Sequence, residues 1–224
     1  MIYGIIDIGS NTIRLSRYRC EENEKVTRLI NKKTMAGLAS YVKNGEITKS
    51  GIKKACEVLN EYKEIIENLK IEKSFVFATA SLRNVTNTDA AVLAIKEKTG
   101  FNVDVLCKLK EIDGLKPNIV ACGVGGTIRA VGKLQEIVLK EEIMRNVIKR
   151  EHIKKIIKKC DNSRKIFLNK ILKVVPDRVH TVVPGLIILN SIVKFYDIKE
   201  IHISSYGVRE GYLFSKVLGG KYNE

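Results

Sequence analysis

The chain reads Asp7-Ile8-Gly9-Ser10-Asn11-Thr12 directly after the apolar run 2–6, and Gly123-Val124-Gly125-Gly126-Thr127 directly after the segment 118–122. A buried strand that ends in a glycine-rich turn exposes backbone N–H groups, and these groups can bind phosphate oxygens. Two such turns predict a phosphate-binding cleft between two similar lobes. The stretch between them is short for the beginning of a second lobe.

The composition is that of a soluble globular protein. The 224 residues, 45% hydrophobic and 29% charged, suffice for one large domain or two small ones. No apolar run is long enough to cross a bilayer, and the N-terminal residues lack the basic start of a signal peptide. The five cysteines are scattered and odd in number. Reduced thiols in a cytoplasmic protein are therefore expected.

The formal net charge of +15 favours a polyanion as partner, such as nucleic acid, polyphosphate or a nucleotide. The alternative is a lysine-rich solvated surface without a partner. No RNA-binding run of basic and aromatic residues and no DNA-reading element is present. We therefore expect no specific nucleic-acid partner and no membrane.

The apolar runs, together with the turn and helix-ending residues between them, predict an α/β protein. Three strands at 2–7, 13–20 and 26–31 form a meander at the N-terminus. A helix with helical apolar spacing follows at 49–70. Further expected elements are strands at 74–78, 102–106, 120–122 and 200–204, a helix at 90–98, a long helical stretch at about 137–173, and a final helix that 207–211 opens.

The first glycine turn has the composition of a phosphate loop. Gly9 lets the backbone approach an anion, and Ser10 and Asn11 add neutral donors. Asp7 can hold a divalent cation or a water molecule. The alternative is an ordinary hairpin turn, since Gly, Ser and Asn are common in turns.

Three further segments are candidates for binding phosphate. In 79–84, Thr79 and Ser81 provide two hydroxyls and Arg83 a guanidinium, and the alternative is a capped helix start with a surface arginine. The second glycine turn is more specific, because three glycines in four positions disfavour helix and strand unless a backbone or ligand comes close. In 207–211 a simple turn from strand to helix is as good an explanation.

These motifs together resemble one family. The series is Asp7-Ile8-Gly9-Ser10-Asn11-Thr12-Ile13-Arg14-Leu15, Ala78-Thr79-Ala80-Ser81-Leu82-Arg83-Asn84 with Asn87, Gly123-Val124-Gly125-Gly126-Thr127-Ile128-Arg129-Ala130, Pro176-Asp177-Arg178 with Pro184-Gly185, and Ser204 with Gly207 and Arg209-Glu210-Gly211. In this order the series closely resembles the Ppx/GppA family of exopolyphosphatases and guanosine pentaphosphate phosphohydrolases.

The resemblance implies an actin-like ATPase fold, an α/β fold with two ribonuclease H-like lobes and an active-site cleft between them. Such enzymes release terminal phosphate from polyphosphate or guanosine pentaphosphate with Mg²⁺. By motif, Asp7 is expected to assist the metal or the attacking water. The expected phosphate-binding residues are Gly9, Ser10, Asn11, Ser81, Arg83, Gly125, Gly126 and Thr127.

The sequence departs from the family at the junction between Leu106 and Cys107. Family members continue here with a Ser-Gly-x-Glu-Glu-Ala segment, whose second glutamate is the presumed general base, and then with a second phosphate loop, Asp-Ile-Gly-Gly-Gly-Ser. Neither is present, so the second lobe is expected to keep only the strands near Val120 and Ile203. Either the segment is deleted from the protein, or it is missing from the sequence as given.

We therefore predict a first lobe at 1–106 and the remainder of a second lobe, with C-terminal helices, at 107–224. The leading functional hypothesis is an exopolyphosphatase-type phosphohydrolase. A relative that binds polyphosphate or nucleotide without turnover, and a kinase of the same superfold, are the alternatives. A homodimer is a further expectation by analogy.

Overall fold

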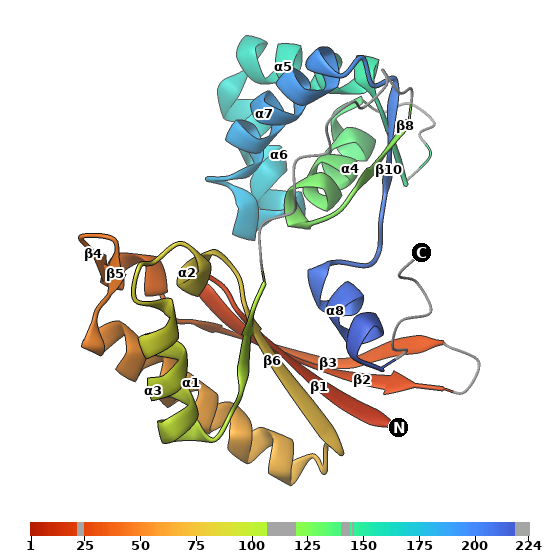
Figure 1. Cartoon of the computed structure of the whole chain (residues 1–224). Coiled ribbons are helices and arrows are strands. Elements are labelled where there is room, and N and C mark those ends of the chain that lie inside the picture. The colour runs from red at the N-terminus through yellow and green to blue at the C-terminus, as the bar shows by residue number, and fades with distance from the viewer. Residues whose placement is uncertain (22–24, 107–119, 140–143, 145, 218–224) are drawn as a thin grey trace. The chain divides into compact units, whose positions relative to one another are not determined.

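The computed structural model describes the chain except residues 22–24, 107–119, 140–143, 145 and 218–224 (Figure 1). It consists of two compact units, Met1–Lys110 and Glu111–Glu224. The lobe boundary predicted at 106/107 adjoins residues outside the described part, as does the expected missing segment, so its position stays a prediction. No helix within the described ranges is long and apolar enough to cross a membrane.

The first unit is built on a five-stranded mixed sheet with the strand order β3-β2-β1-β6-β7. The first three strands form the expected antiparallel meander, and β6 and β7 run parallel to β1. The strands are β1 (Ile2–Ile8), β2 (Thr12–Cys20), β3 (Val26–Met35), β6 (Lys73–Ala78) and β7 (Val103–Val105). Because β1, β6 and β7 are parallel, their carboxyl ends meet at one edge of the sheet.

Two helices supply most of the apolar cover of this sheet, α1 (Lys49–Asn68) and α3 (Thr88–Thr99) (Figure 1). The hydroxyl of Thr48 caps α1 by accepting from the Gly51 N–H at 3.3 Å, and Gly100 ends α3 in a left-handed conformation. The buried Tyr62 hydroxyl of α1 donates to the Ile13 carbonyl at 2.9 Å, and burial raises the pKa of this phenol. The short elements are η1 (Leu38–Tyr41), β4 (Val42–Lys43), β5 (Glu46–Ile47) and α2 (Ala80–Arg83).

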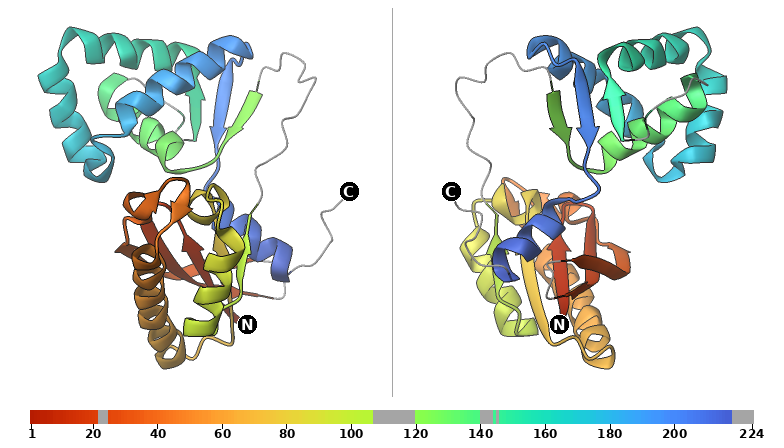
Figure 2. Two further views of the ribbon diagram at one scale, coloured as in Figure 1. Left: turned by 60° about the vertical axis from the view of Figure 1, so that its left-hand side comes forward. Right: turned by 90° about the vertical axis from the view of Figure 1, so that its right-hand side faces the viewer.

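The second unit has a three-stranded sheet with the order β8-β10-β9. Its strands are β8 (Val120–Gly123), β9 (Val147–Lys149) and β10 (Glu200–Ile203), with β8 parallel and β9 antiparallel to β10. The helical elements are α4 (Gly126–Leu139), α5 (Arg150–Asn162), α6 (Arg164–Val174), η2 (Pro176–Arg178), α7 (Val182–Phe195) and α8 (Val208–Val217). Figure 2 shows α4 to α7 gathered into one cluster, which shares a single apolar core with the sheet.

The prediction of one long helical stretch at about 137–173 is wrong in one respect. The structure has strand β9 and two separate helices, α5 and α6, within these residues. Val147 and Ile148 pair with β10, which is more than fifty residues away in sequence. A strand of three residues, placed directly before a lysine-rich helix, does not alter the helical periodicity of the window around it. The second sheet therefore has a third strand beside the two that the sequence predicted.

Candidate phosphate-binding site

The first glycine turn connects β1 to β2 as a hairpin. Gly9 N–H donates to the Thr12 carbonyl at 3.0 Å, and Ala39 N–H donates to the Ser10 carbonyl at 2.8 Å. The Asn11 carbonyl accepts from the N–H groups of the two residues that follow β3, both at 3.0 Å. Within the described residues, the hydrogen bonds of Ser10 and Asn11 all use their carbonyl oxygens. Their N–H groups are therefore the part of the turn that can bind an anion.

Asp7 lies at the carboxyl end of β1, two residues before Gly9, and it is half-buried. In the antiparallel register with β2 it stands directly opposite Arg14. Residues that face each other in this way share one face of the sheet, and opposite charges there stabilise the pair. The strand pairing thus places a carboxylate and a guanidinium together beside the turn.

Ser81 links the end of β6 to the end of β1. Its hydroxyl donates to the Ile8 carbonyl at 2.8 Å, and only 3% of the residue is exposed. The same carbonyl accepts from Thr79 N–H at 3.2 Å. Because the hydroxyl proton of Ser81 is directed to the backbone, this side chain positions the segment 79–84 against the first turn.

Arg83 reaches the end of the third parallel strand. Its Nη1 donates to the carbonyl of Leu106, the residue after β7, at 3.4 Å, and its Nε lies 3.4 Å from Asn84 Oδ1. Leu106 N–H in turn donates to the Ala78 carbonyl at 3.0 Å. Arg83 therefore places a half-exposed guanidinium at the same sheet edge as the first turn.

The second glycine turn connects β8 to the first turn of α4. Gly125 has φ +119°, which strains any other residue, and a Cβ at Gly123 would lie 2.5 Å from Ile128 Cγ2. A Cβ at Gly126 would lie 2.2 Å from Nη2 of Arg178. Only glycine lets this guanidinium lie directly against the backbone. The turn thus combines helix-start N–H groups, which have no acceptor within the helix, with a neighbouring positive charge.

Two more motif residues hold the second turn in place. A Cβ at Gly185, near the start of α7, would lie 2.3 Å from Thr127 Cγ2, so the glycine permits close packing. Arg129 Nη1 donates to the Ser204 carbonyl at 3.3 Å, and Ser204 N–H donates to the Gly123 carbonyl at 2.9 Å. Beside these contacts is a cavity of about 310 Å³, lined by Arg129, Gly132, Lys133, Glu136, Asn146, Ile203, Ser204 and Ser205.

The segment 207–211 forms the start of α8, which begins at Val208. Glu210, which is 5% exposed, accepts a hydrogen bond from Gly207 N–H through Oε2 at 2.7 Å. A glutamate that reaches back to the N–H before the helix is half of a capping box. The buried carboxylate therefore caps α8.

The sequence-predicted residues form one group in each unit. In the first unit the structure gathers Asp7, the first turn, Ser81 and Arg83 at one sheet edge. In the second unit Gly126 and Thr127 form the start of α4, and Gly125 directly precedes it. Sequence reasoning missed the role of Arg178, although it stands in the Pro176-Asp177-Arg178 motif.

A protein-family model and several known proteins match this chain. The model of the Ppx/GppA phosphatase family matches residues 19–113 and 108–219, so the match divides next to the junction at Leu106 and Cys107. Exopolyphosphatase 1 of Mycobacterium tuberculosis is 26% identical over 107 residues, which is 47% of this chain. The match spans 31% of the length of that relative, and the Mycobacterium leprae protein is 26% identical over 32% of its length.

Solved structures resemble the chain over nearly its full length. The Aquifex aeolicus member of the Ppx/GppA family has a TM-score of 0.75 at 20% identity, covering 97% of this chain and 98% of that one. An exopolyphosphatase from Cytophaga hutchinsonii has a TM-score of 0.73 at 15% identity, covering 98% of both chains. These likenesses confirm the predicted α/β class and the actin-like ATPase fold.

Proposed function

Because the chain belongs to the Ppx/GppA phosphatase family, we propose that it is a phosphoanhydride hydrolase that releases terminal orthophosphate from linear polyphosphate. The observation that carries this proposal is the group at the sheet edge of the first unit. It consists of a carboxylate, a turn with available N–H groups and a guanidinium, held by bonds between the ends of β1, β6 and β7. The names of the mycobacterial relatives point to the same substrate.

The proposed reaction needs positioning and charge neutralisation more than covalent chemistry. Water attacks the terminal phosphorus, the bridging P–O bond breaks, and orthophosphate leaves a chain shortened by one unit. The N–H groups of Ser10 and Asn11 and the guanidinium of Arg83 would bind phosphate oxygens. In the second unit, the start of α4 and Arg178 offer the same chemistry.

The donor set fits Mg²⁺ as a metal that arrives with its substrate. Within the described residues no group of three or more His, Cys, Asp or Glu side chains could hold a metal by itself. Mg²⁺ is usually bound by one or two carboxylates together with substrate phosphates and water. Asp7, beside the phosphate-binding turn, provides one such carboxylate. When bound, Mg²⁺ would neutralise charge on the transferred phosphate.

A second candidate is a protein that binds polyphosphate or nucleotide without turnover. One observation favours it: Leu106, the residue after β7, is followed by Cys107-Lys108-Leu109 in place of the segment that carries the presumed general base in the family. A base contributes about 10²- to 10⁴-fold to such reactions. The groups that bind phosphate would remain without it.

An assay of phosphate release separates these functions. Purified protein is incubated with linear polyphosphate and Mg²⁺ in the absence of nucleotide, and orthophosphate is measured. We expect release from polyphosphate, with guanosine pentaphosphate as the close alternative substrate. Tight binding without release would select the second candidate. Phosphate transfer that requires ADP or ATP would indicate a kinase of the same superfold.

A further inference from the structure

Helices α5 and α6 carry much of the positive charge of this protein. Residues 150–174 contain seven lysines and two arginines against Glu151 and Asp161. These residues therefore account for seven of the fifteen net positive charges. The candidate phosphate-binding residues all lie outside this segment, so the proposed function does not explain it.

The amphipathic pattern places this charge on the outer surface. Ile153 and Ile156 of α5 and Phe167 and Ile171 of α6 are buried in the core of the second unit. The lysines occupy the remaining faces, since residues four apart share one side of a helix. The exposed basic residues are Lys154, Lys155, Lys158, Lys159, Arg164, Lys165 and Lys173.

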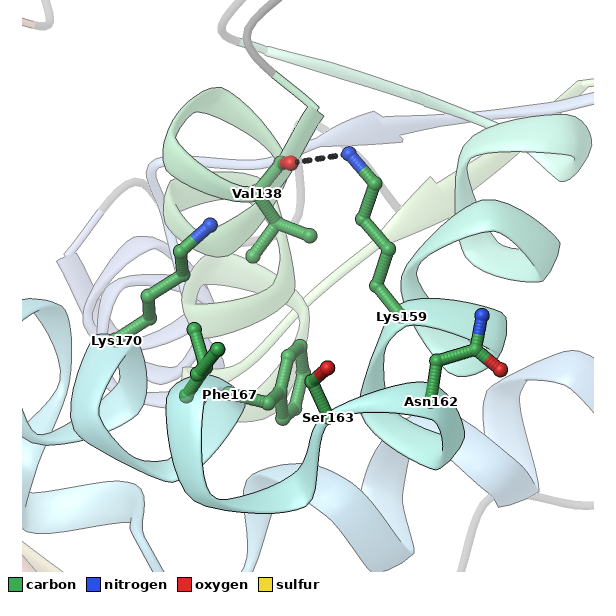
Figure 3. A pocket seen from close by; sticks show the side chains of 7 residues that line it. Val138, Lys159, Asn162, Ser163, Phe167 and Lys170 are labelled. Carbon is green, nitrogen blue, oxygen red and sulfur yellow. Dashed lines mark hydrogen bonds between the residues drawn. The ribbon is translucent and has the colours of Figure 1, made fainter.

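Two hollows with basic linings lie along α5. One, of about 350 Å³, lies where α4, α5 and α6 meet, and Lys159 and Lys170 line it (Figure 3). Lys159 there donates to the Val138 carbonyl at 2.7 Å. The other, of about 340 Å³, lies at the start of α5 and is lined by Lys149, Arg150, Glu151, Lys154 and Lys199. Positive groups thus extend along the whole of α5, about 18 Å at 1.5 Å per residue.

We propose that α5 and α6 form a binding surface for the distal part of a long polyphosphate chain. This inference rests on the proposed function, and it adds that the protein favours long chains over short ones. A long polyanion can contact many protein cations at once, and each contact releases counterions condensed on the polyanion, whereas a short chain makes few such contacts. The surface, named here the α5–α6 surface, acts in binding and has no part in the chemical step.

The residue types favour polyphosphate over nucleic acid. Lysine binds any phosphate as a point charge, so the lysines fit polyphosphate and a nucleic-acid backbone equally, and the aromatic residues make the difference. Residues 150–174 have seven lysines and two arginines, of which six lysines and Arg164 are exposed, while Arg150 pairs with Asp197. Binding of single-stranded nucleic acid generally adds exposed aromatic rings on which bases stack. The one aromatic residue in 150–174, Phe167, is only 3% exposed.

Paired charge-removing variants test the inference. Lys154→Gln with Lys158→Gln removes two exposed charges that lie four residues apart on α5. Lys53→Gln with Lys96→Gln removes two exposed charges from α1 and α3 and serves as the matched control. Affinities for long-chain polyphosphate and for tripolyphosphate are measured over a series of salt concentrations, with circular dichroism to verify folding. We expect the α5 variant to bind the long chain about tenfold more weakly with a smaller salt slope, and the control to bind normally.

Three outcomes would overturn the inference: equal weakening by the control pair, unchanged long-chain affinity in the α5 variant, or tighter binding of single-stranded RNA or duplex DNA than of polyphosphate. The hydrolysis of tripolyphosphate is measured in parallel. If tripolyphosphate is hydrolysed but the α5 variant binds long and short chains as the natural protein does, the proposed function stands and the binding role of the α5–α6 surface is refuted. If the α5 variant binds long chains more weakly but the natural protein hydrolyses no polyphosphate, the binding role of the α5–α6 surface stands and the proposed hydrolase function is refuted.

Discussion

The two glycine turns of this protein are similar in sequence and different in construction. The first joins two antiparallel strands, and backbone hydrogen bonds to Thr12, Ser10 and Asn11 carbonyls hold it. The second joins a strand to a helix of fourteen residues, and side chains hold it, with Arg178 against Gly126 and Thr127 against Gly185. Gly9 in the first turn therefore lets the backbone come close to the Thr12 carbonyl. Gly126 in the second turn lets the side chain of Arg178, from elsewhere in the chain, lie against the backbone.

This difference bears on how each turn can bind phosphate. The first offers N–H groups beside Asp7, whose carboxylate faces Arg14 across the strand pair, so a metal or Arg83 would have to neutralise the substrate. The second offers helix-start N–H groups with a guanidinium already in contact. We therefore expect substitution of Asp7 to affect the chemical step most, and substitutions of Arg83 and of the second turn to affect binding.

The largest effect should come from Asp7→Asn. If Asp7 assists the metal or the water, its neutral amide should lower the rate of orthophosphate release by about 100-fold or more. Polyphosphate binding without Mg²⁺ should change much less. Asp89→Asn, at an exposed position in the first turn of α3, is the control and should keep the full rate. A normal rate in Asp7→Asn would remove this residue from the catalytic site.

Arg83→Ala should weaken polyphosphate binding ten- to a hundredfold, because a charge-assisted hydrogen bond contributes about 1.5–3 kcal/mol. Titration calorimetry would measure it. Arg83→Lys retains the charge without the two-pronged guanidinium and should recover only part of the affinity. Unchanged affinity in Arg83→Ala would mean that the bond to the Leu106 carbonyl is the whole role of this residue.

Gly126→Ala tests whether Arg178 contributes to phosphate binding at the second turn. The new methyl group would displace the guanidinium of Arg178, which is the flexible end of a long side chain. We therefore expect about tenfold weaker binding of polyphosphate at an almost unchanged melting temperature.

The matched control for this variant is Gly211→Ala, where a Cβ meets no atom within 4 Å. It should leave binding unaffected. Normal binding by Gly126→Ala would show that Arg178 is not part of the phosphate site, and the second turn would then be a packing feature.

The smallest effect is expected for Ser81→Ala. Loss of the bond to the Ile8 carbonyl should lower the free energy of unfolding by about 1 kcal/mol and the melting temperature by about 2–4 °C. Ile8 keeps its bond from Thr79 N–H, which limits the cost. A large loss of polyphosphate affinity at unchanged stability would contradict the positioning role and assign Ser81 to direct phosphate contact.

Local signals were enough to predict the main elements of the first unit. The apolar run before Asp7, the periodicity of α1 and the glycine after α3 predicted strand, helix and helix end, and all three are confirmed. The two turns were predictable for the same reason, since a strand followed by glycines is visible within ten residues.

What the sequence did not reveal depends on contacts between distant residues. Arg178 lies against Gly126, which is 52 positions away, and no local pattern distinguishes it from a surface arginine. The Ser81 hydroxyl finds its acceptor 73 positions away, at Ile8. Strand β9 is defined by pairing with β10 and not by its own three residues. In each case the deciding interaction forms only once the sheets have assembled.

The most direct test of the central claim is the initial rate of orthophosphate release from linear polyphosphate, measured with and without Mg²⁺ in the absence of nucleotide. We expect release that requires Mg²⁺ in the natural protein and falls by about 100-fold or more in Asp7→Asn. Polyphosphate that binds to the natural protein but releases no orthophosphate would contradict it, and the protein would then be a polyphosphate-binding member of its family.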